Sequence, residues 1–389
     1  MYRILIINLK FILILIFICF LSKSSYAQKS ELKIAALLPL SGKYADLGKR
    51  ILNTIQITIF ELDNLDIRIY PFDTKSSNLG AREAFIKARE KNLNIFVGPI
   101  TSETLSGLVE IDGFQKSFFF TFSNKENKVP SNVINFGINL SSEIEALKGL
   151  LKTRKDKIIF FGRDNYFSKI AFERIKSNVK VKEKYLYKNF KEINKLSLKA
   201  TNFSYRNKKH LNQIKKLKAS GDESDSNFAK ELEKHDTSEG VNFKRVFMPS
   251  FNNDLIASIS FFDFYDADYK SVQFITFNQW FNKKLLIEPS LENLIFPSIN
   301  FESFKDLNKK YKKIYGHDIK NIEILAFDMI PLIASTWFNK EENYLQISDF
   351  QNFTFKGKTG SFKIKQNKAN YNLNLYKIKK SKFIKLKKI

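Results

Sequence analysis

Polar side chains occupy four short segments of this sequence, each directly after an apolar run. In strand–turn–helix units, ligands lie at the carboxyl ends of the strands, where helix N-termini direct free N–H groups outward. Hydroxyl donors beside helix N-termini favour an anionic group. These strand ends are therefore the places where a ligand could bind. The candidate ligand-binding residues are Ser41, Tyr44, Thr101, Ser102, Ser123, Asn124, Asp164 and Tyr166.

A second interpretation of the same residues is structural. Serine and threonine after a strand often cap the next helix, because the hydroxyl accepts from a free backbone N–H group. A tyrosine near a turn often packs on its own lobe. Both interpretations stay open for every candidate.

The elements that must position these residues alternate along the chain. Apolar runs predict strands at 34–38, 67–73, 95–100 and 117–122, with helices after 44–48, over 80–91 and from 101. A short strand at 133–139 follows, and the alternation then restarts with strands at 157–161, 181–187, 245–249, 272–277 and 294–299. Such alternation predicts α/β lobes with parallel sheets covered on both faces. At 389 residues, the chain has the length of two domains.

The later part of the chain contains other elements. The polar stretch 202–239 predicts two short helices around a loop at 221–225. Helices are expected over 304–315 and 322–338. The runs 361–365, 373–378 and 382–386 predict antiparallel strands after the turn at 357–360.

The N-terminus has the pattern of a secretory signal peptide. Arg3 and Lys10 flank the apolar run 11–21, and Ser25 and Ala27 supply small residues for cleavage after residue 27. The only cysteine, Cys19, lies inside this run and follows Ile18, so we expect no lipid anchor and no disulfide in the mature chain. No stable membrane anchor is expected, and the predicted location is the periplasm.

The formal charge is +25. It permits a partner with negative charge, such as nucleic acid, anionic lipid or an acidic polymer. The other interpretation is compositional drift, since lysines are scattered over nearly every predicted helix. They form no nucleic-acid-binding signature, so we expect no nucleic-acid partner. One local cluster could touch an anionic surface or form a solvated terminal strand: Lys377, Lys379, Lys380, Lys382, Lys385, Lys387 and Lys388.

Catalysis and metal binding have no support in the sequence. His210, His235 and His317 lie in polar segments without ligand spacing. Gly42 and Gly48 lack the G-x-G-x-x-G spacing of a dinucleotide site, and no nucleophile elbow or phosphate loop is present. We predict a protein that is not an enzyme and has no cofactor and no metal site.

Several motifs resemble those of a known family. The opening 34–48, IAALLPLSGKYADLG, the loops 97–102, 121–124 and 162–166, and the pairs Tyr315-Gly316 and Phe327-Asp328 are similar to type I periplasmic binding proteins, the leucine/isoleucine/valine-binding group. The resemblance covers about 31–386. It is closest to the penicillin-binding-protein activator branch, through "LLPLSGKYA-LG" and a terminal strand at 358–362.

The resemblance implies two Rossmann-like lobes joined by three crossing segments, with a cleft between them. Lobe 1 would comprise 28–140 and 297–340, and lobe 2 would comprise 141–296 and 341–389. In amino-acid-binding relatives, the ends of the third and fourth strands hold the ligand carboxylate and an acid of lobe 2 takes the ammonium group. Asp164 is the nearest match to that acid, and Tyr44 and Tyr166 would pack on the ligand.

Two functions follow from the resemblance. The first is a non-catalytic periplasmic regulator whose partner is a peptidoglycan synthase, that is, a penicillin-binding protein. The alternative is a solute-binding protein that delivers an amino acid or similar small ligand to an ABC transporter permease. Phe167 replaces a common glycine and Phe118 to Phe120 make the fourth strand bulky. A cleft partly filled by phenylalanine would favour the first function.

Overall fold

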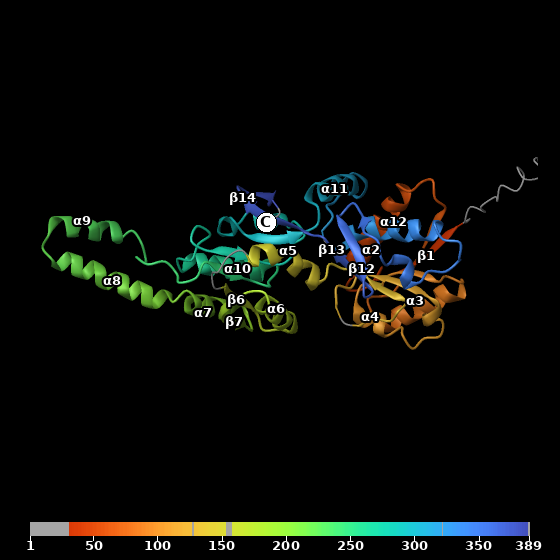
Figure 1. Ribbon diagram of the computed structural model, residues 1–389, viewed down its shortest axis with the longest axis horizontal. Coiled ribbons are helices and arrows are strands. Elements are labelled where there is room, and N and C mark those ends of the chain that lie inside the picture. Colours follow the sequence, from red (N-terminus) through yellow and green to blue (C-terminus); the bar gives the residue numbers. More distant parts are fainter. Residues whose placement is uncertain (1–30, 127, 153–157, 321, 388–389) are drawn as a thin grey trace, which may run out of the picture.

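The computed structural model describes residues 31–126, 128–152, 158–320 and 322–387 of the chain. The predicted signal peptide, 1–27, lies outside these residues. The described chain is elongated, with two α/β lobes along the long axis and a pair of helices projecting beyond the second lobe (Figure 1). Among the described residues, no helix is long and apolar enough to cross a membrane.

The first lobe is built on a mixed sheet. Its strands run in the order β11-β12-β13-β5-β4-β3-β1-β2, and the five strands from β5 to β2 are parallel. The strands are β1 (Leu32–Leu38), β2 (Ile67–Asp73), β3 (Ile95–Val97), β4 (Phe118–Thr121), β5 (Val133–Asn135), β11 (Phe355–Lys356), β12 (Ser361–Lys365) and β13 (Lys368–Tyr371).

Strand β1 shows why the apolar runs predicted this sheet. Ile34 and Leu38 pack in the core shared with α2 and α12, while Ala35 and Leu37 pack on the opposite face with α3. A strand buried on both faces has no polar alternation, so it reads as a continuous apolar run. The helices of this lobe are α2 (Ala45–Phe60), α3 (Asn78–Glu90), α4 (Ser102–Ser106), α11 (Phe301–Tyr315) and α12 (Ala326–Phe338).

The second lobe repeats this arrangement with strand order β15-β14-β10-β9-β8-β6-β7. Its strands are β6 (Ile158–Arg163), β7 (Val181–Tyr187), β8 (Arg245–Phe247), β9 (Gln273–Ile275), β10 (Ile295–Ser298), β14 (Asn374–Lys379) and β15 (Lys382–Lys385). Its helices are α5 (Leu140–Lys152), α6 (Tyr166–Lys176), α7 (Phe190–Ala200), α8 (Phe203–Ala219), α9 (Glu223–Leu232) and α10 (Asn252–Phe264). Short 3-10 turns complete the described chain at η1 (Phe114–Lys116), η2 (Lys283–Leu286), η3 (Pro289–Leu291), η4 (Ile322–Leu325) and η5 (Ile347–Phe350).

The chain passes between the two sheets at three places. The passages lie between β5 and α5, between β10 and α11, and between β13 and β14. The third passage corrects the predicted assignment of 341–389 to lobe 2, because β11, β12 and β13 belong to the first sheet and only the strands from Asn374 onward belong to the second. The run 361–365 is an antiparallel strand as predicted, and its partner is β13, which follows it across a turn at Gln366 and Asn367.

Aromatic residues fill both lobes. Phe118 and Phe120 pack on Phe350 on one face of the first sheet, and Phe119 stacks on Phe96 and Phe114 on the other. These side chains are therefore core residues, and the expectation that Phe118 to Phe120 could fill a cleft is wrong. Their burial follows from their position in a central strand with helices on both faces.

The polar stretch 202–239 forms α8 and α9, and α8 is longer than the short helix predicted there. The two helices pack on each other and project away from the second sheet (Figure 1). Arg206 fixes their base: its guanidinium donates to the carbonyl oxygens of Thr201 (2.9 Å), Glu239 (2.9 Å) and Tyr265 (2.6 Å) and to the hydroxyl of Thr237 (3.1 Å). Because this guanidinium is buried and donates several hydrogen bonds, the α8–α9 hairpin is held in one orientation.

Candidate functional site: the cavity between the lobes

A cavity of about 840 Å³ lies between the two lobes. The loops after β3 and β4 form its wall in lobe 1, and α6 with the loops after β8 and β9 forms its wall in lobe 2. The first passage and the start of α5 also line it. The lining includes Thr101, Ser102, Phe122, Ser123, Asn124, Glu126, Ile138, Leu140, Glu143, Tyr166, Phe167, Ile170, Arg174, Phe251, Asn278 and Trp280.

Five of the eight predicted site residues line this cavity: Thr101, Ser102, Ser123, Asn124 and Tyr166. They meet because the carboxyl ends of parallel strands lie at one edge of a sheet. Their hydroxyls also have local roles. The Thr101 hydroxyl accepts from the backbone N–H of Thr104 and caps α4, and the Ser123 hydroxyl accepts from the backbone N–H of Lys125. The capping interpretation is thus confirmed for Thr101, while ligand binding stays a prediction.

Ser41 and Tyr44 are not among the residues that line the cavity. Their loop is tied to the end of β2 instead. The backbone N–H of Ser41 donates to Asp73, at 3.1 Å, and the backbone N–H of Tyr44 donates to the hydroxyl of Ser76, at 3.0 Å. Both side chains are exposed, and the Lys43 ammonium lies 5.3 Å from the centre of the Tyr44 ring.

Asp164 is also outside the lining. Its carboxylate forms an ion pair with Lys169 at 2.9 Å, and this hydrogen-bonded ammonium lowers the pKa of Asp164. The structure places a different acid of lobe 2 at the cavity. Glu143 lies in the first turns of α5, only 6% exposed, and the backbone N–H of Asn278 donates to its Oε1 at 2.7 Å.

The environment of Glu143 favours the neutral carboxyl. Burial raises its pKa to about 8, the Asn278 hydrogen bond opposes that shift, and the charge of Glu126 adds to it. Asn278 is itself held, because its side-chain oxygen accepts from the hydroxyl of Ser298 at 2.8 Å and from the backbone N–H of Trp280 at 3.0 Å. Glu143 is not among the eight residues predicted from the sequence.

An ion pair links the two lobes beside the cavity. Arg174 of α6 donates to Glu126, from the loop after β4, at 2.9 Å, and to the hydroxyl of Ser141 at 3.3 Å. The other oxygen of Glu126 accepts from the backbone N–H of Ser141 at 2.6 Å. One carboxylate therefore binds both the start of α5 and a helix of the opposite wall.

Much of the remaining lining is apolar. Phe167 lies 5.8 Å from Phe251 and 5.7 Å from Phe277 between ring centres, so it packs on its own lobe and leaves the cavity open. Phe122, Ile138 and Trp280 add apolar surface. A cavity lined by apolar side chains and a few polar groups can bind a small organic molecule and orient it through a few hydrogen bonds.

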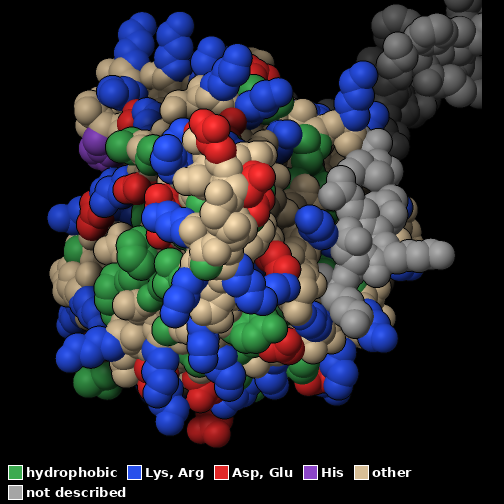
Figure 2. Space-filling model, turned by 90° about the vertical axis from the view of Figure 1, so that its left-hand side faces the viewer, with side chains coloured by type: hydrophobic (Ala, Val, Ile, Leu, Met, Phe, Trp, Pro, Cys, Tyr) green, Lys and Arg blue, Asp and Glu red, His purple; other side chains and the backbone are tan. Residues whose placement is uncertain are grey.

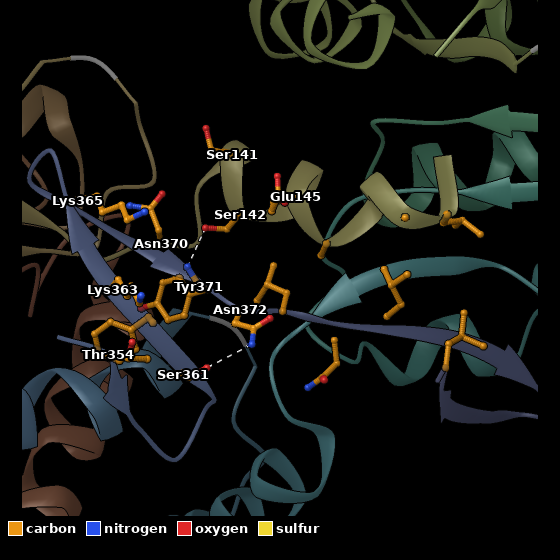
Figure 3. A pocket seen from close by; sticks show the side chains of 18 of the residues that line it. Ser141, Ser142, Glu145, Thr354, Ser361, Lys363, Lys365, Asn370, Tyr371 and Asn372 are labelled. Carbon is orange, nitrogen blue, oxygen red and sulfur yellow. Dashed lines mark hydrogen bonds between the residues drawn. The ribbon is translucent and has the colours of Figure 1, made fainter. Parts of the chain in front are cut away.

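A second groove, of about 860 Å³, lies at the third passage between the lobes. Lys363, Lys365 and Asn370 line it from β12 and β13, and Ser141, Ser142 and Glu145 line it from α5 (Figure 3). The backbone N–H of Tyr371 donates to Ser142 at 2.9 Å, and Asn372 donates to Ser361 at 3.5 Å. The first of these bonds holds the third passage against the start of α5, and the second ties the passage to the start of β12.

On the face shown in Figure 2, the basic side chains are not gathered in one band. Figure 2 shows the end of the molecule that carries α8 and α9, where Lys and Arg side chains are spread over the face among fewer acids. Among the described residues, no group of three His, Cys, Asp or Glu could hold a metal ion. His210 contacts the hydroxyl of Ser238 at 2.5 Å, and the His317 ring packs on Tyr311.

No protein-family model matches the sequence, and no curated protein matches it either. Solved structures do. The branched-chain amino acid transporter substrate-binding protein LivJ from Streptococcus pneumoniae, in complex with isoleucine, has a TM-score of 0.56 and 14% identity, over 92% of this chain and 100% of that one. A second similar structure is the closed conformation of the leucine-, isoleucine-, valine-, threonine- and alanine-binding protein of Brucella ovis. Its TM-score is 0.63 at 15% identity, and the match covers 92% of this chain and 94% of that one.

Full-length LpoA from Haemophilus influenzae is also similar, with a TM-score of 0.59 and 13% identity, and the match covers 93% of this chain and 60% of LpoA. At such identities the similarity establishes the fold. The predicted fold class, two Rossmann-like lobes with three passages and a cleft, is confirmed.

Proposed function

We propose, from the fold that this chain shares with type I periplasmic binding proteins, that it is a non-catalytic binding protein of the periplasm. Its proposed role is that of a penicillin-binding-protein activator, which regulates peptidoglycan synthesis by docking on a synthase. LpoA, one of the similar structures, is such an activator. The predicted signal peptide supports the location.

The observation that carries this proposal is the state of the charged groups at the cavity between the lobes. A free amino acid needs an ionised carboxylate for its ammonium group. Both carboxyl groups of the described lining are already engaged: Glu126 binds Arg174 and the N–H of Ser141, and Glu143 binds the N–H of Asn278. With a pKa of about 8, Glu143 is mostly neutral at pH 7. The cavity is therefore a poor match for an amino acid.

The projecting hairpin of α8 and α9 supports a role in docking. Tyr205 is 61% exposed and Leu211 is 56% exposed on α8, and Phe228 is 51% exposed on α9. Exposed apolar side chains on an element held firmly by Arg206 could contribute to a surface that binds another protein.

Solute transport is the second candidate, and the cavity volume favours it. About 840 Å³ falls within the range of small-molecule sites. Thr101, Ser102, Ser123 and Asn124 could hold an anionic group there. LivJ, which has the same fold, was solved with isoleucine. In this case the partner would be an ABC transporter permease.

Two measurements on one preparation separate the candidates. Thermal unfolding is recorded with each of the twenty common amino acids, because a ligand that binds the folded state raises the midpoint. The immobilised protein is then incubated with membrane extract, and the retained penicillin-binding proteins are detected with fluorescent penicillin. Retention of a synthase without any amino-acid shift supports the activator role. Saturable micromolar binding of leucine, without retention of a synthase, would overturn it.

The hairpin provides a matched variant for the second measurement. Tyr205→Ser with Leu211→Ser is expected to reduce retention of the synthase, whereas Phe60→Ser changes an 82% exposed side chain of the other lobe and is expected to leave it unchanged. Equal retention by both variants would place the docking surface elsewhere.

A further inference from the structure

The C-terminal strands β14 and β15 form a hairpin with an unusual charge. Residues 374–387 contain six lysines and no Asp or Glu. The structure describes all six, and none of their ammonium groups has a carboxylate of a described residue within 4.0 Å. The nearest described acid contact is Glu292, whose carboxylate accepts from the backbone N–H of Lys380 at 3.0 and 3.1 Å.

The pairing register places part of this charge on one face. Lys377 pairs with Ile384 and Lys379 pairs with Lys382 across the hairpin. Because alternate side chains of a strand point to opposite faces, these four side chains share the outer face. Tyr376, Ile378 and Phe383 point the other way and are buried.

The outer face also carries apolar surface. Ile384 is 41% exposed and lies on this face with Lys377 and Lys382. Leu375 and Leu386 continue the same face toward α5, where they are partly buried against its core, and they line the groove at the third passage together with Lys387. The face therefore combines unpaired ammonium groups with aliphatic side chains.

The hairpin lies at an edge of its sheet, because β15 is the last strand of the second sheet. Lysines on an edge strand commonly prevent pairing with another chain. That role needs only charge along the free edge. It does not account for Lys377 and Lys379 on the inner strand β14, nor for the exposed aliphatic residue beside them.

We propose that the outer face of the β14–β15 hairpin docks the protein on an anionic phospholipid surface. The ammonium groups of Lys377, Lys379 and Lys382 would bind lipid phosphates, and Ile384 would enter the interface between headgroups and acyl chains. Basic residues near an anionic membrane each strengthen binding about fivefold, and salt screens the attraction. The proposal is independent of the function proposed above.

The test uses the chain from Gln28, after the predicted cleavage site, with vesicles of phosphatidylcholine alone or with 30% phosphatidylglycerol. Binding is measured by sedimentation of the vesicles at low salt and at physiological salt. The variant replaces Lys377, Lys379 and Lys382 by Gln. It is expected to bind anionic vesicles about a hundredfold more weakly than the parent.

The matched control replaces Lys208, Lys215 and Lys216 of α8 by Gln. These lysines are exposed, as are Lys379 and Lys382, whereas Lys377 is half-buried. No described carboxylate lies within 4.0 Å of their ammonium groups, and the change in net charge is the same as in the hairpin variant. The control is expected to bind within a factor of three of the parent. Thermal unfolding of each variant verifies the fold.

Three results would overturn the proposal. In the first, the parent fails to sediment with anionic vesicles, and in the second it binds both kinds of vesicle equally. In the third, the β14–β15 variant and the control lose binding to the same extent. An Ile384→Ser variant tests the aliphatic contribution separately, and it is expected to weaken binding less than the triple variant.

Discussion

Replacing Glu143 by Gln is expected to remove most of the pH dependence of stability around the cavity. In the folded protein the pKa of Glu143 is about 8, against a usual value of 4.5. At pH values below 4.5, both the folded and the unfolded chain hold the proton. As the pH rises from 4.5 to 8, the unfolded chain releases this proton and the folded protein keeps it. The free energy of unfolding therefore falls as the pH rises through this window.

The size of the effect follows from the shift. One pKa unit corresponds to about 1.4 kcal/mol, so a shift from 4.5 to about 8 lowers the free energy of unfolding by about 5 kcal/mol across the window. Glutamine does not titrate, and its side-chain oxygen can still accept from the N–H of Asn278. The free energy of unfolding of the Glu143→Gln variant should thus rise relative to that of the parent by about 5 kcal/mol between pH 4 and pH 8.5.

Urea unfolding at pH 4, 5, 6, 7 and 8.5 measures this difference. Trp280 lines the cavity, and Trp337→Phe in both proteins leaves Trp280 as the fluorescent reporter. Glu145→Gln, two residues along the same helix on its exposed side, is the control and should keep the pH dependence of the parent. If Glu143→Gln and the parent show parallel curves, the argument that Glu143 is buried as a neutral carboxyl is wrong.

Three further predictions concern the two lobes and the α8–α9 hairpin. Arg174→Gln breaks the ion pair with Glu126 between the lobes, and since Arg174 is half exposed we expect only a two- to fivefold shift toward conformations with the lobes apart. Energy transfer between dyes on Lys87→Cys and Lys195→Cys measures the distance between the lobes, and an unchanged distance distribution would show that the pair does not hold them together. Gly357→Ala places a Cβ atom against the Asp328 carboxyl, which binds the backbone N–H groups of Lys358 and Thr359, so we expect the free energy of unfolding in urea to fall by about 2 kcal/mol. Gly240→Ala, where the added Cβ meets no atom within 4 Å, is the control and should leave the free energy of unfolding nearly unchanged. Arg206→Met removes the hydrogen bonds at the base of α8, so trypsin should cleave within α8 and α9 several times faster than in the parent; equal cleavage rates would show that the base is held by other contacts.

The sequence was sufficient to predict the two α/β lobes. Strands such as β1 and β6 are buried on both faces, so their apolar runs are continuous and hard to mistake. The sheet membership of β11 to β13 could not be predicted in this way. The alternating pattern of β12 is similar to that of β14, and it says nothing about which sheet a strand joins.

The candidate site was predictable only in part. Thr101 and Ser123 follow parallel strands, and that topology brings them together. Glu143 was missed because a carboxyl in an amphipathic helix is normally solvated, and its burial arises only where the first passage packs against the loop of Asn278. Asp164 was misplaced because a strand end does not reveal that Lys169 will bind the carboxylate.

The most direct test of the proposed function is a binding measurement with two ligands. The mature chain is titrated by calorimetry with leucine, and in parallel with a purified penicillin-binding synthase from the same organism. The activator role predicts saturable binding of the synthase, a change in its rate of glycan polymerisation or cross-linking, and no heat with leucine. Saturable micromolar binding of leucine, with no binding of the synthase, would contradict it.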